Sequence, residues 1–188
     1  MATPASASPA IDVPAVWTVG HSTHSGEAFL ALLRSHGIEA LVDVRRFPGS
    51  RRHPQFGADA LGTMLEANGI AYEWVRELGG RRRPLDGDPD GSAWRHPSFR
   101  AYAQHLQTEE FAQGLATLMH VASACRTAMM CSELLWWRCH RALIADALLA
   151  LGWQVTHILG PGKDSGHRLS SPARLEDGVL TYRAPDCC

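Results

Sequence analysis

Short apolar runs alternate with amphipathic segments along the chain from residue 16 onward. The runs predict five strands, at 16–20, 40–44, 70–75, 127–131 and 154–159. Between them, apolar side chains recur at helical spacing, as at Phe29, Leu32 and Leu33, and glycines follow two such stripes at Gly69 and Gly152. Strands joined by helices imply right-handed crossovers and a mostly parallel sheet. The pattern therefore predicts a single three-layer α/β domain, with a five-stranded Rossmann-like sheet and helices on both faces.

This domain is expected to occupy residues 16–188. Residues 1–15 are rich in Ala, Pro and Ser, which predicts a disordered lead-in. Residues 79–97 are rich in Gly, Pro, Arg and Asp, which predicts a long loop or lid. After residue 160 the pattern indicates loops and one short strand at 179–183. No stretch approaches the roughly 20 apolar residues of a membrane span, so no membrane partner is expected.

The charge of the chain is nearly balanced, with a formal net charge of -1 and a pI near 6.8. This balance argues against a protein held to nucleic acid by bulk electrostatics. Seventeen of the eighteen basic residues are arginines, however, and they cluster at 45–53 and 79–84. These clusters predict either a local anion-binding surface or a solvated face. The five cysteines are odd in number and lack framework spacing, which favours reduced thiols and a cytoplasmic protein.

Polar residues follow three of the predicted strands directly. In open parallel sheets, ligands bind beyond the carboxyl ends of the strands, where the strand order reverses. If the order is 3-2-1-4-5, the three groups face one pocket. These groups are Gly20-His21-Ser22-Thr23, Asp43-Val44-Arg45 and Cys131-Ser132-Glu133.

The segment "CSELLWWRCHR" (131–141) carries the most concentrated candidate chemistry. Cys139 falls at the start of a predicted helix, where the helix field favours a thiolate and makes it a candidate nucleophile. A small buried hydrophobe is the competing interpretation. Arg141 is positioned to bind a phosphate or carboxylate together with the free helix amides, although an ion pair with Glu133 or Asp43 would also explain it. Cys131 ends an apolar strand, which favours core packing.

The remaining candidates offer acid-base and ligand-binding groups. Asp43 and Glu133 are two carboxylates at predicted strand ends, suited to general-base work or to orienting a histidine. His21 is a candidate proton donor or acceptor, and Arg45 a candidate anion ligand. Ser22 reads first as a loop hydroxyl that satisfies free amides. For each of these residues a purely structural role stays open.

Cysteine and histidine side chains near this segment also raise the question of a metal. The spacing C-x₇-C-H matches none of the common zinc patterns, so no metal ligands are assigned. The C-x₅-R loop, the G-x-S-x-G elbow and the Walker P-loop are all absent from the sequence. Trp136 and Trp137 beside Arg138 suggest either base stacking or a cap on the core.

Six segments in order resemble a bacterial and archaeal family catalogued as domain of unknown function 488. They are "TVGHST", "LVDVRRFPGSRRHPQF", "ELGGRRRP", "FRAYAQHLQTEEF", "MCSE" and "CHRALIADAL". The resemblance covers about residues 16–183 and implies an α/β fold, but it supplies no reaction. It also implies a shared site at His21, Asp43, Arg45, Cys131, Glu133, Cys139, His140 and Arg141.

Two main hypotheses follow. In the first, a polar pocket binds a small anionic ligand, phosphorylated or nucleotide-like, through Arg45, Arg141, His140 and the free amides at the helix start. A hydrolase or transferase then uses Cys139 as nucleophile, with Glu133, His21 and Asp43 as acid-base groups. In the second, the same groups form a non-catalytic nucleotide or nucleic-acid binding module. A Cys/His/Glu metal-dependent site is a further alternative. The sequence assigns no cofactor and no oligomeric state.

Overall fold

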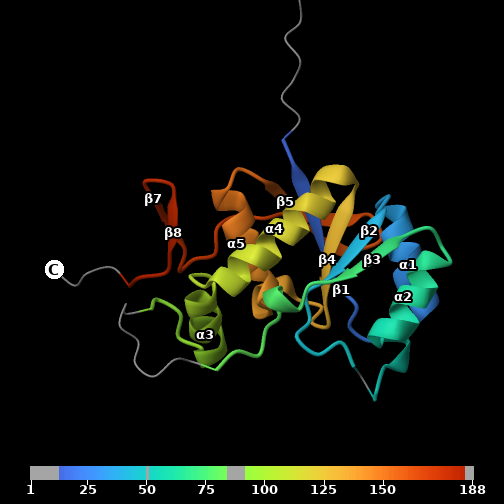
Figure 1. Cartoon of the computed structure of the whole chain (residues 1–188). Helices are drawn as coiled ribbons and strands as arrows, with labels where there is room; N and C mark the ends of the chain where they lie inside the picture. The colour runs from blue at the N-terminus through green and yellow to red at the C-terminus, as the bar shows by residue number, and fades with distance from the viewer. Residues whose placement is uncertain (1–12, 50, 84–91, 185–188) are drawn as a thin grey trace, which may run out of the picture.

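The computed structural model describes residues 13–49, 51–83 and 92–184 as a mixed α/β protein built on a six-stranded sheet (Figure 1). The strand order is β3-β2-β4-β1-β5-β6. Five strands are parallel, and β6 pairs antiparallel with β5 at one edge. The strands of this sheet are β1 (Ala15–Gly20), β2 (Ala40–Asp43), β3 (Ala71–Trp74), β4 (Thr127–Cys131), β5 (Gln154–Gly160) and β6 (Lys163–Gly166).

The five strands expected from the apolar runs are confirmed, but the expected strand number is wrong. The edge strand β6 has the sequence Lys-Asp-Ser-Gly, which carries no apolar alternation, because three of its four residues are exposed and none enters a core. A separate two-stranded hairpin joins β7 (Arg174–Glu176) and β8 (Val179–Thr181). Asp177 and Gly178 both have positive φ between these strands, and this Asp-Gly pair is a sequence signal for such a turn.

The expected strand order 3-2-1-4-5 is also wrong, because β4 lies between β2 and β1. Hydrophobic patterning does not distinguish the two orders, since each central strand is buried on both faces in either case. The carboxyl ends of the three strands that carry the polar groups are still neighbours. Parallel pairing aligns Gly20 with Cys131, and Asp43 with Met130.

Five α-helices in the described residues connect the strands, and each coincides with an apolar stripe expected from the sequence. Ser25 caps the first helix through a bond from the amide of Ala28, and Thr108 caps the fourth through a bond from the amide of Phe111. No helix in the described part of the chain is both long and apolar enough to cross a membrane. The helices are α1 (Gly26–Ser35), α2 (Ala58–Glu66), α3 (Pro97–His105), α4 (Glu109–Ala124) and α5 (Arg141–Ala150).

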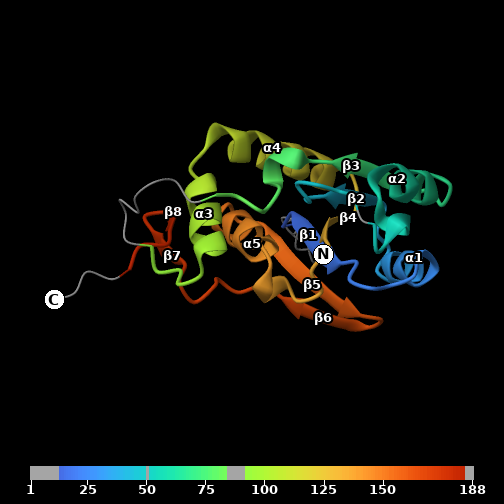
Figure 2. The same cartoon turned by 90° about the horizontal axis from the view of Figure 1, so that it is seen from below.

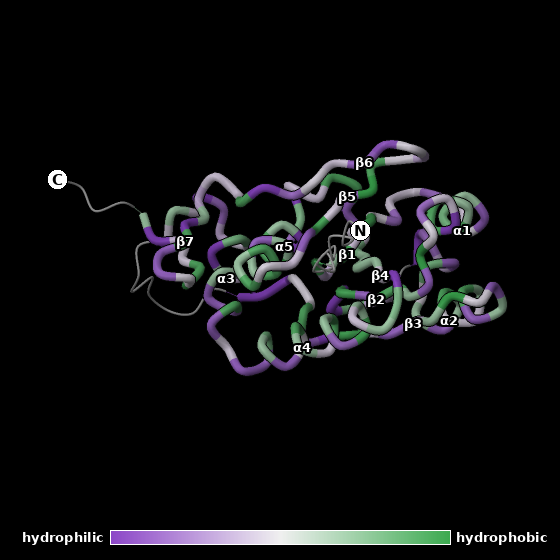
Figure 3. The backbone as a smooth tube through the Cα atoms, turned by 90° about the horizontal axis from the view of Figure 1, so that it is seen from above, coloured by the Kyte–Doolittle hydropathy of each residue, from purple (hydrophilic) through white to green (hydrophobic). Residues whose placement is uncertain are grey.

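Two hydrophobic cores lie on opposite faces of the sheet. Helices α1 and α2 pack on one face, and α4 and α5 pack on the other, with α3 beside α5 (Figure 2). Alternating residues of one strand enter different cores: Met129 and Cys131 join the α4/α5 core, whereas Ala128 and Met130 join the α1/α2 core. Figure 3 shows the hydrophilic residues gathered mainly in peripheral segments such as β7.

Two expected segments fall partly outside the described residues. These are the lead-in, of which 1–12 are not described, and the loop at 79–97, of which 84–91 are not described.

Candidate functional site

The candidate site lies where β1, β4 and β2 end. The backbone continues the pairing one step past the strands, as the amide of His21 donates to the carbonyl of Cys131 and the amide of Ser22 to that of Ser132, both at 3.0 Å. The loop after β4 then folds closely over the end of β1. A Cβ atom on Gly20 would lie 2.0 Å from the carbonyl oxygen of Glu133, so only glycine fits there.

A buried polar cluster of Asp43, Arg45, His21 and Tyr72 occupies the α1/α2 face of these strand ends. Asp43 accepts Nε of Arg45 at 2.8 Å and Nη2 at 2.5 Å, and the hydroxyl of Tyr72 donates to the same carboxylate at 2.8 Å. Nη1 of Arg45 donates to Nε2 of His21 at 3.2 Å, while Nδ1 of His21 donates to the carbonyl of Ser22 at 3.0 Å. This cluster therefore satisfies most of its hydrogen bonds internally.

The electrostatics of this cluster keep His21 neutral. Burial and the adjacent positive charge of Arg45 lower the pKa of His21 from 6.5 to about 4. The imidazole also stacks on Phe56, with 4.1 Å between ring centroids. His21 thus accepts a hydrogen bond from Arg45 through a fixed tautomer.

A second cluster, of Cys131, Cys139 and His140, occupies the α4/α5 face. The two Sγ atoms and a ring nitrogen of His140 all lie within 4.8 Å of one another. Nδ1 of His140 is 3.5 Å from Sγ of Cys139, and Nε2 donates to the carbonyl of Val44 at 2.8 Å. Because Nε2 carries the proton, Nδ1 presents its lone pair to the thiol. A Cβ on Gly80 would lie 2.8 Å from this Nδ1, so the 79–83 loop packs directly against the cluster.

The buried side chain of Arg141 packs against this second cluster. Its side chain is only 1% exposed, and its Nε donates to Sγ of Cys139 at 3.4 Å. Nη2 donates to the carbonyl of Glu133, and Nη1 contacts the hydroxyl of Thr18 at 3.5 Å. Among the residues that the structure describes, no carboxylate forms an ion pair with Arg141. The thiolate of Cys139 is therefore the available counter-charge for this guanidinium.

The two thiols have opposite acidities. Burial raises the pKa of Cys139, but a hydrogen bond from Cys131 and the charge and hydrogen bonds of Arg141 outweigh it and lower the pKa from 9.0 to about 6. The same hydrogen bond, together with burial, raises the pKa of Cys131 to about 12. At neutral pH, Cys139 is thus the thiolate and Cys131 the thiol that donates to it.

A buried relay that sequence reasoning missed extends from Arg141. The Thr18 hydroxyl bonds Nδ1 of His157 at 2.8 Å, Nε2 of His157 bonds Nδ1 of His167 at 3.0 Å, and Nε2 of His167 donates to Asp146 at 2.8 Å. Tyr182 and the amide of Ser170 also donate to Asp146. These residues come from distant parts of the chain, so no local motif indicates them.

The structure brings most of the expected site residues together, in two groups rather than one. Ser22, with φ of 46°, is half-buried and contributes its backbone carbonyl. Glu133 is exposed, and its contribution to the cluster is its backbone carbonyl. Helix α5 begins at Arg141, so this residue opens the helix rather than lying within it, and it packs inward. The sheet separates the acid-base group His21 from Cys139, while His140 takes the position next to the thiolate.

The fold and this geometry define an α/β protein with a cysteine and histidine cluster at the carboxyl ends of its central parallel strands. The chain belongs to the family described as "Domain of unknown function DUF488", which matches residues 25–148. The expected resemblance is therefore confirmed. No curated protein and no solved structure matches the chain.

Proposed function

We propose that the protein is a cysteine-dependent enzyme, a hydrolase or transferase, in which Cys139 is the nucleophile and the substrate is a phosphorylated or other anionic molecule. The proposal also includes a three-layer Rossmann-like fold, which the two cores on opposite faces support. A reactive thiolate must stay reduced, so the proposal includes a cytoplasmic location.

The observation that carries the proposal is the pairing of Arg141 with Cys139. Burying a cation without a counter-charge destabilises a protein by roughly several kcal/mol, and an anion beside the cation offsets this penalty. Nε of Arg141 lies 3.4 Å from Sγ of Cys139, and Cys139 itself is 3% exposed. A guanidinium held by backbone carbonyls at this position favours the ionised, nucleophilic form of the thiol.

His140 supplies the base that a cysteine nucleophile needs. Its Nδ1 faces Sγ of Cys139, and its Nε2 is held by the carbonyl of Val44. Nucleophile, base and orienting group thus stand in the order found in cysteine-histidine enzymes generally. We therefore assign the acid-base role to His140, and a positioning role in the neighbouring cluster to Asp43 and His21.

In this mechanism, Sγ of Cys139 donates its electron pair to the electrophilic centre of the substrate. Nδ1 of His140 holds the proton that the Cys139 thiol gives up when it ionises. The bond to the leaving group breaks, the leaving group takes its electron pair, and His140 passes this proton to it. Water or an acceptor alcohol then attacks the Cys139 adduct and returns the thiolate. The proton released by that attack goes back to His140.

The arginine-rich segments 46–52 and 79–83, here called the arginine loops, support an anionic substrate. Arg45 and Arg141 do not, because most of their donors are already hydrogen-bonded inside the protein. The two loops touch, since a Cβ on Gly79 would lie 2.6 Å from Cα of Arg46. Four arginines on these loops are exposed and form no ion pair with any described carboxylate, which leaves their charge available for an anion. They are Arg51, Arg52, Arg81 and Arg83.

The proposal is tested by turnover of p-nitrophenyl phosphate and p-nitrophenyl acetate, with intact-protein mass spectrometry to detect a covalent adduct. The expected result is a burst of p-nitrophenolate and an adduct on Cys139, both lost in Cys139→Ser. His140→Gln is expected to slow turnover at least ~100-fold, the scale of general-base catalysis. Cys125→Ser, at the half-buried end of α4, is the matched control and should retain full activity.

Full turnover by Cys139→Ser would overturn the proposal. Absence of any adduct or turnover, combined with tight and salt-dependent binding of inorganic phosphate, would favour the non-catalytic binding module instead. In that case Arg81→Ala and Arg83→Ala should weaken binding, while Cys139→Ser should leave it unchanged.

A second candidate is a metal-dependent site, and the observation that favours it is the compactness of the Cys131, Cys139 and His140 cluster. Two thiolates and one imidazole, with the imidazole oriented by a backbone carbonyl, are a suitable three-ligand set for zinc with one open position. Zinc titration with elemental analysis tests it. Stoichiometric zinc in the purified protein, lost in Cys131→Ala, would replace the free nucleophile with a metal centre.

A further inference from the structure

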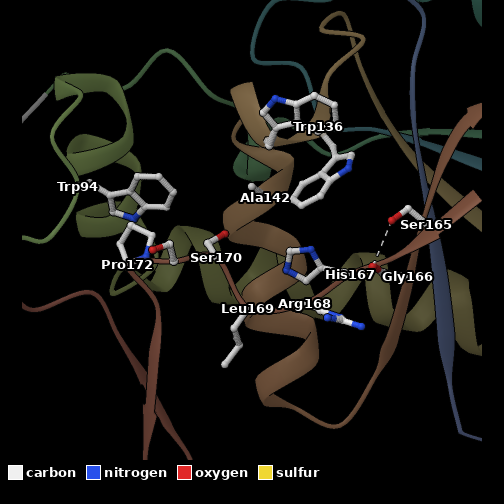
Figure 4. Close-up of a pocket in the computed structure, with 12 residues that line it drawn as sticks. Trp94, Trp136, Ala142, Ser165, Gly166, His167, Arg168, Leu169, Ser170 and Pro172 are labelled. Carbon is white, nitrogen blue, oxygen red and sulfur yellow. Dashed lines mark hydrogen bonds between the residues drawn. The ribbon is translucent and has the colours of Figure 1, made fainter.

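A cavity of about 700 Å³ opens beside the start of α5, with walls from three separate parts of the chain (Figure 4). Trp94 precedes α3, and Trp136 and Trp137 belong to the short turn before α5. Ala142 of α5 and the segment 165–172 form the rest of the lining. We propose that this cavity binds a mononucleotide, with the base between the indoles and the phosphate at Arg168. Neither Cys131, Cys139 nor His140 lines the cavity, so the inference goes beyond the proposed thiol chemistry.

The aromatic walls are held rigidly for stacking. Trp136 lies flat on His157, with 3.9 Å between centroids and an interplanar angle of 4°, and Trp94 stacks on Phe99 at 4.6 Å. Trp137 stands perpendicular to Trp136 and is 51% exposed. Indoles fixed in this way offer flat surfaces to a heteroaromatic ring at little cost in conformational entropy, and one base-aromatic stack contributes about 1–3 kcal/mol.

The floor of the cavity is anchored by the buried relay. Both ring nitrogens of His167 are engaged, one with His157 and one with Asp146. The amide of Ser170 also bonds Asp146, which fixes the segment that follows His167. The floor therefore keeps one shape, as a preformed ligand site requires.

The charge of the lining favours an anionic ligand. No aspartate or glutamate is among the described lining residues, whereas Arg168 is exposed and forms no ion pair with any described carboxylate. The hydroxyls of Ser165 and Ser171 add polar groups. A guanidinium and hydroxyls next to an apolar aromatic wall match a phosphate joined to a flat ring.

Trp94 provides an independent indication of a polar ligand atom. Its Nε1 is buried and has no hydrogen-bond partner in the described part of the chain. A buried donor without an acceptor is destabilising by roughly 1–3 kcal/mol. Because protein atoms cover Nε1, a bound base would relieve this cost only through a rotation of the indole that brings Nε1 to the cavity surface.

The size of the cavity selects a small ligand over a polymer. Small-molecule pockets fall in the range of roughly 300–1,000 Å³, and a mononucleotide fits within it. The near-neutral net charge of -1 also gives little general attraction for a long nucleic acid.

The test is calorimetric titration of the full chain with AMP, adenosine and ribose 5-phosphate. AMP is expected to bind at least ~10-fold more tightly than either fragment, because only AMP uses both the indoles and Arg168. Arg168→Ala should weaken AMP at least ~5-fold, reduce its salt dependence and leave adenosine unchanged. Trp137→Ala should weaken AMP and adenosine alike by ~5-fold or more.

Matched controls come from exposed residues outside the lining, namely Arg76→Ala for the charge and Trp74→Ala for the indole. Both should bind AMP as the parent protein does. The proposal would be overturned if AMP did not bind detectably. It would also be overturned if AMP bound no more tightly than ribose 5-phosphate, or no more tightly than adenosine. Cys139→Ser should retain AMP binding, so failure of the thiol mechanism is distinguishable from failure of this site.

Discussion

The interaction between the two thiols, whose Sγ atoms lie within 4.8 Å of each other, gives the sharpest test of the site. At neutral pH, the S–H of Cys131 donates to the thiolate of Cys139, whose pKa is about 6. Cys131→Ala removes this donor. A hydrogen bond to a charged group contributes about 1.5–3 kcal/mol, which corresponds to about 1–2 pKa units. The pKa of Cys139 should therefore rise to between about 7 and 8, and its ionised fraction at pH 7 should fall from ~90% to ~10–50%.

The assay is a pH titration of the ultraviolet absorbance of the thiolate, which needs no reagent to reach a buried sulfur. Each curve is the difference between a protein and the same protein carrying Cys139→Ser, so the signals of the cysteines outside the cluster cancel. The parent midpoint is read below pH 8, because the pKa of Cys131, which Cys139 raises, lies far above this range. Cys131→Ser is the matched control, because its hydroxyl keeps a donor and should shift the pKa less than Cys131→Ala does. An unchanged midpoint in Cys131→Ala, or a parent protein with no transition below pH 8, would refute the reasoning.

Three further predictions concern the strand ends. Asp43→Asn should lower the free energy of unfolding by about 3–5 kcal/mol in urea titrations, because it leaves Arg45 buried without its carboxylate, and a change under 1 kcal/mol would contradict this. Gly20→Ala should lower the free energy of unfolding by roughly several kcal/mol, because its Cβ would clash with the carbonyl of Glu133. Gly49→Ala is the control and should leave the free energy of unfolding nearly unchanged, because the space around Gly49 is open. The fold also lowers the pKa of His21 from 6.5 to about 4, so stability should fall as pH drops through that window, where the unfolded chain binds the proton first. The urea midpoint of His21→Asn should depend less on pH there, and an equal dependence would argue against it.

The hydrophobic pattern predicted the elements well but not their arrangement. All five parallel strands coincide with apolar runs. For β2 and β4 the reason is burial on both faces, which requires apolar residues throughout, whereas β3 is mostly exposed and was recognised by its β-branched and aromatic residues. The order 3-2-1-4-5 was wrong because the pattern shows that a strand is central without showing which strands are its neighbours. The edge strand β6 was missed because its residues are polar or glycine and mostly exposed, so it leaves no apolar run in the sequence.

The candidate site shows the same division. Polar residues directly after apolar runs indicated the site, because parallel strands bring their carboxyl ends to one edge of the sheet. Cys139 and Arg141 were indicated separately, because they lie at the start of a predicted helix, which is α5 in the structure. The distribution over two faces was not predicted, since it depends on the residue at which each strand stops. One step along a strand turns a side chain to the other face, so Asp43 faces α2 while the thiols face α5.

The sequence by itself determined the α/β class, the family and the set of residues from which a site could be built. Only the tertiary structure decided which of them meet. The relay from Thr18 through His157 and His167 to Asp146 joins residues separated by up to 139 positions, and the cavity combines residues on either side of α5. Such contacts depend on how the helices pack on the sheet. The periodicity of the sequence shows which face of each element is buried, but it does not show which elements that face contacts.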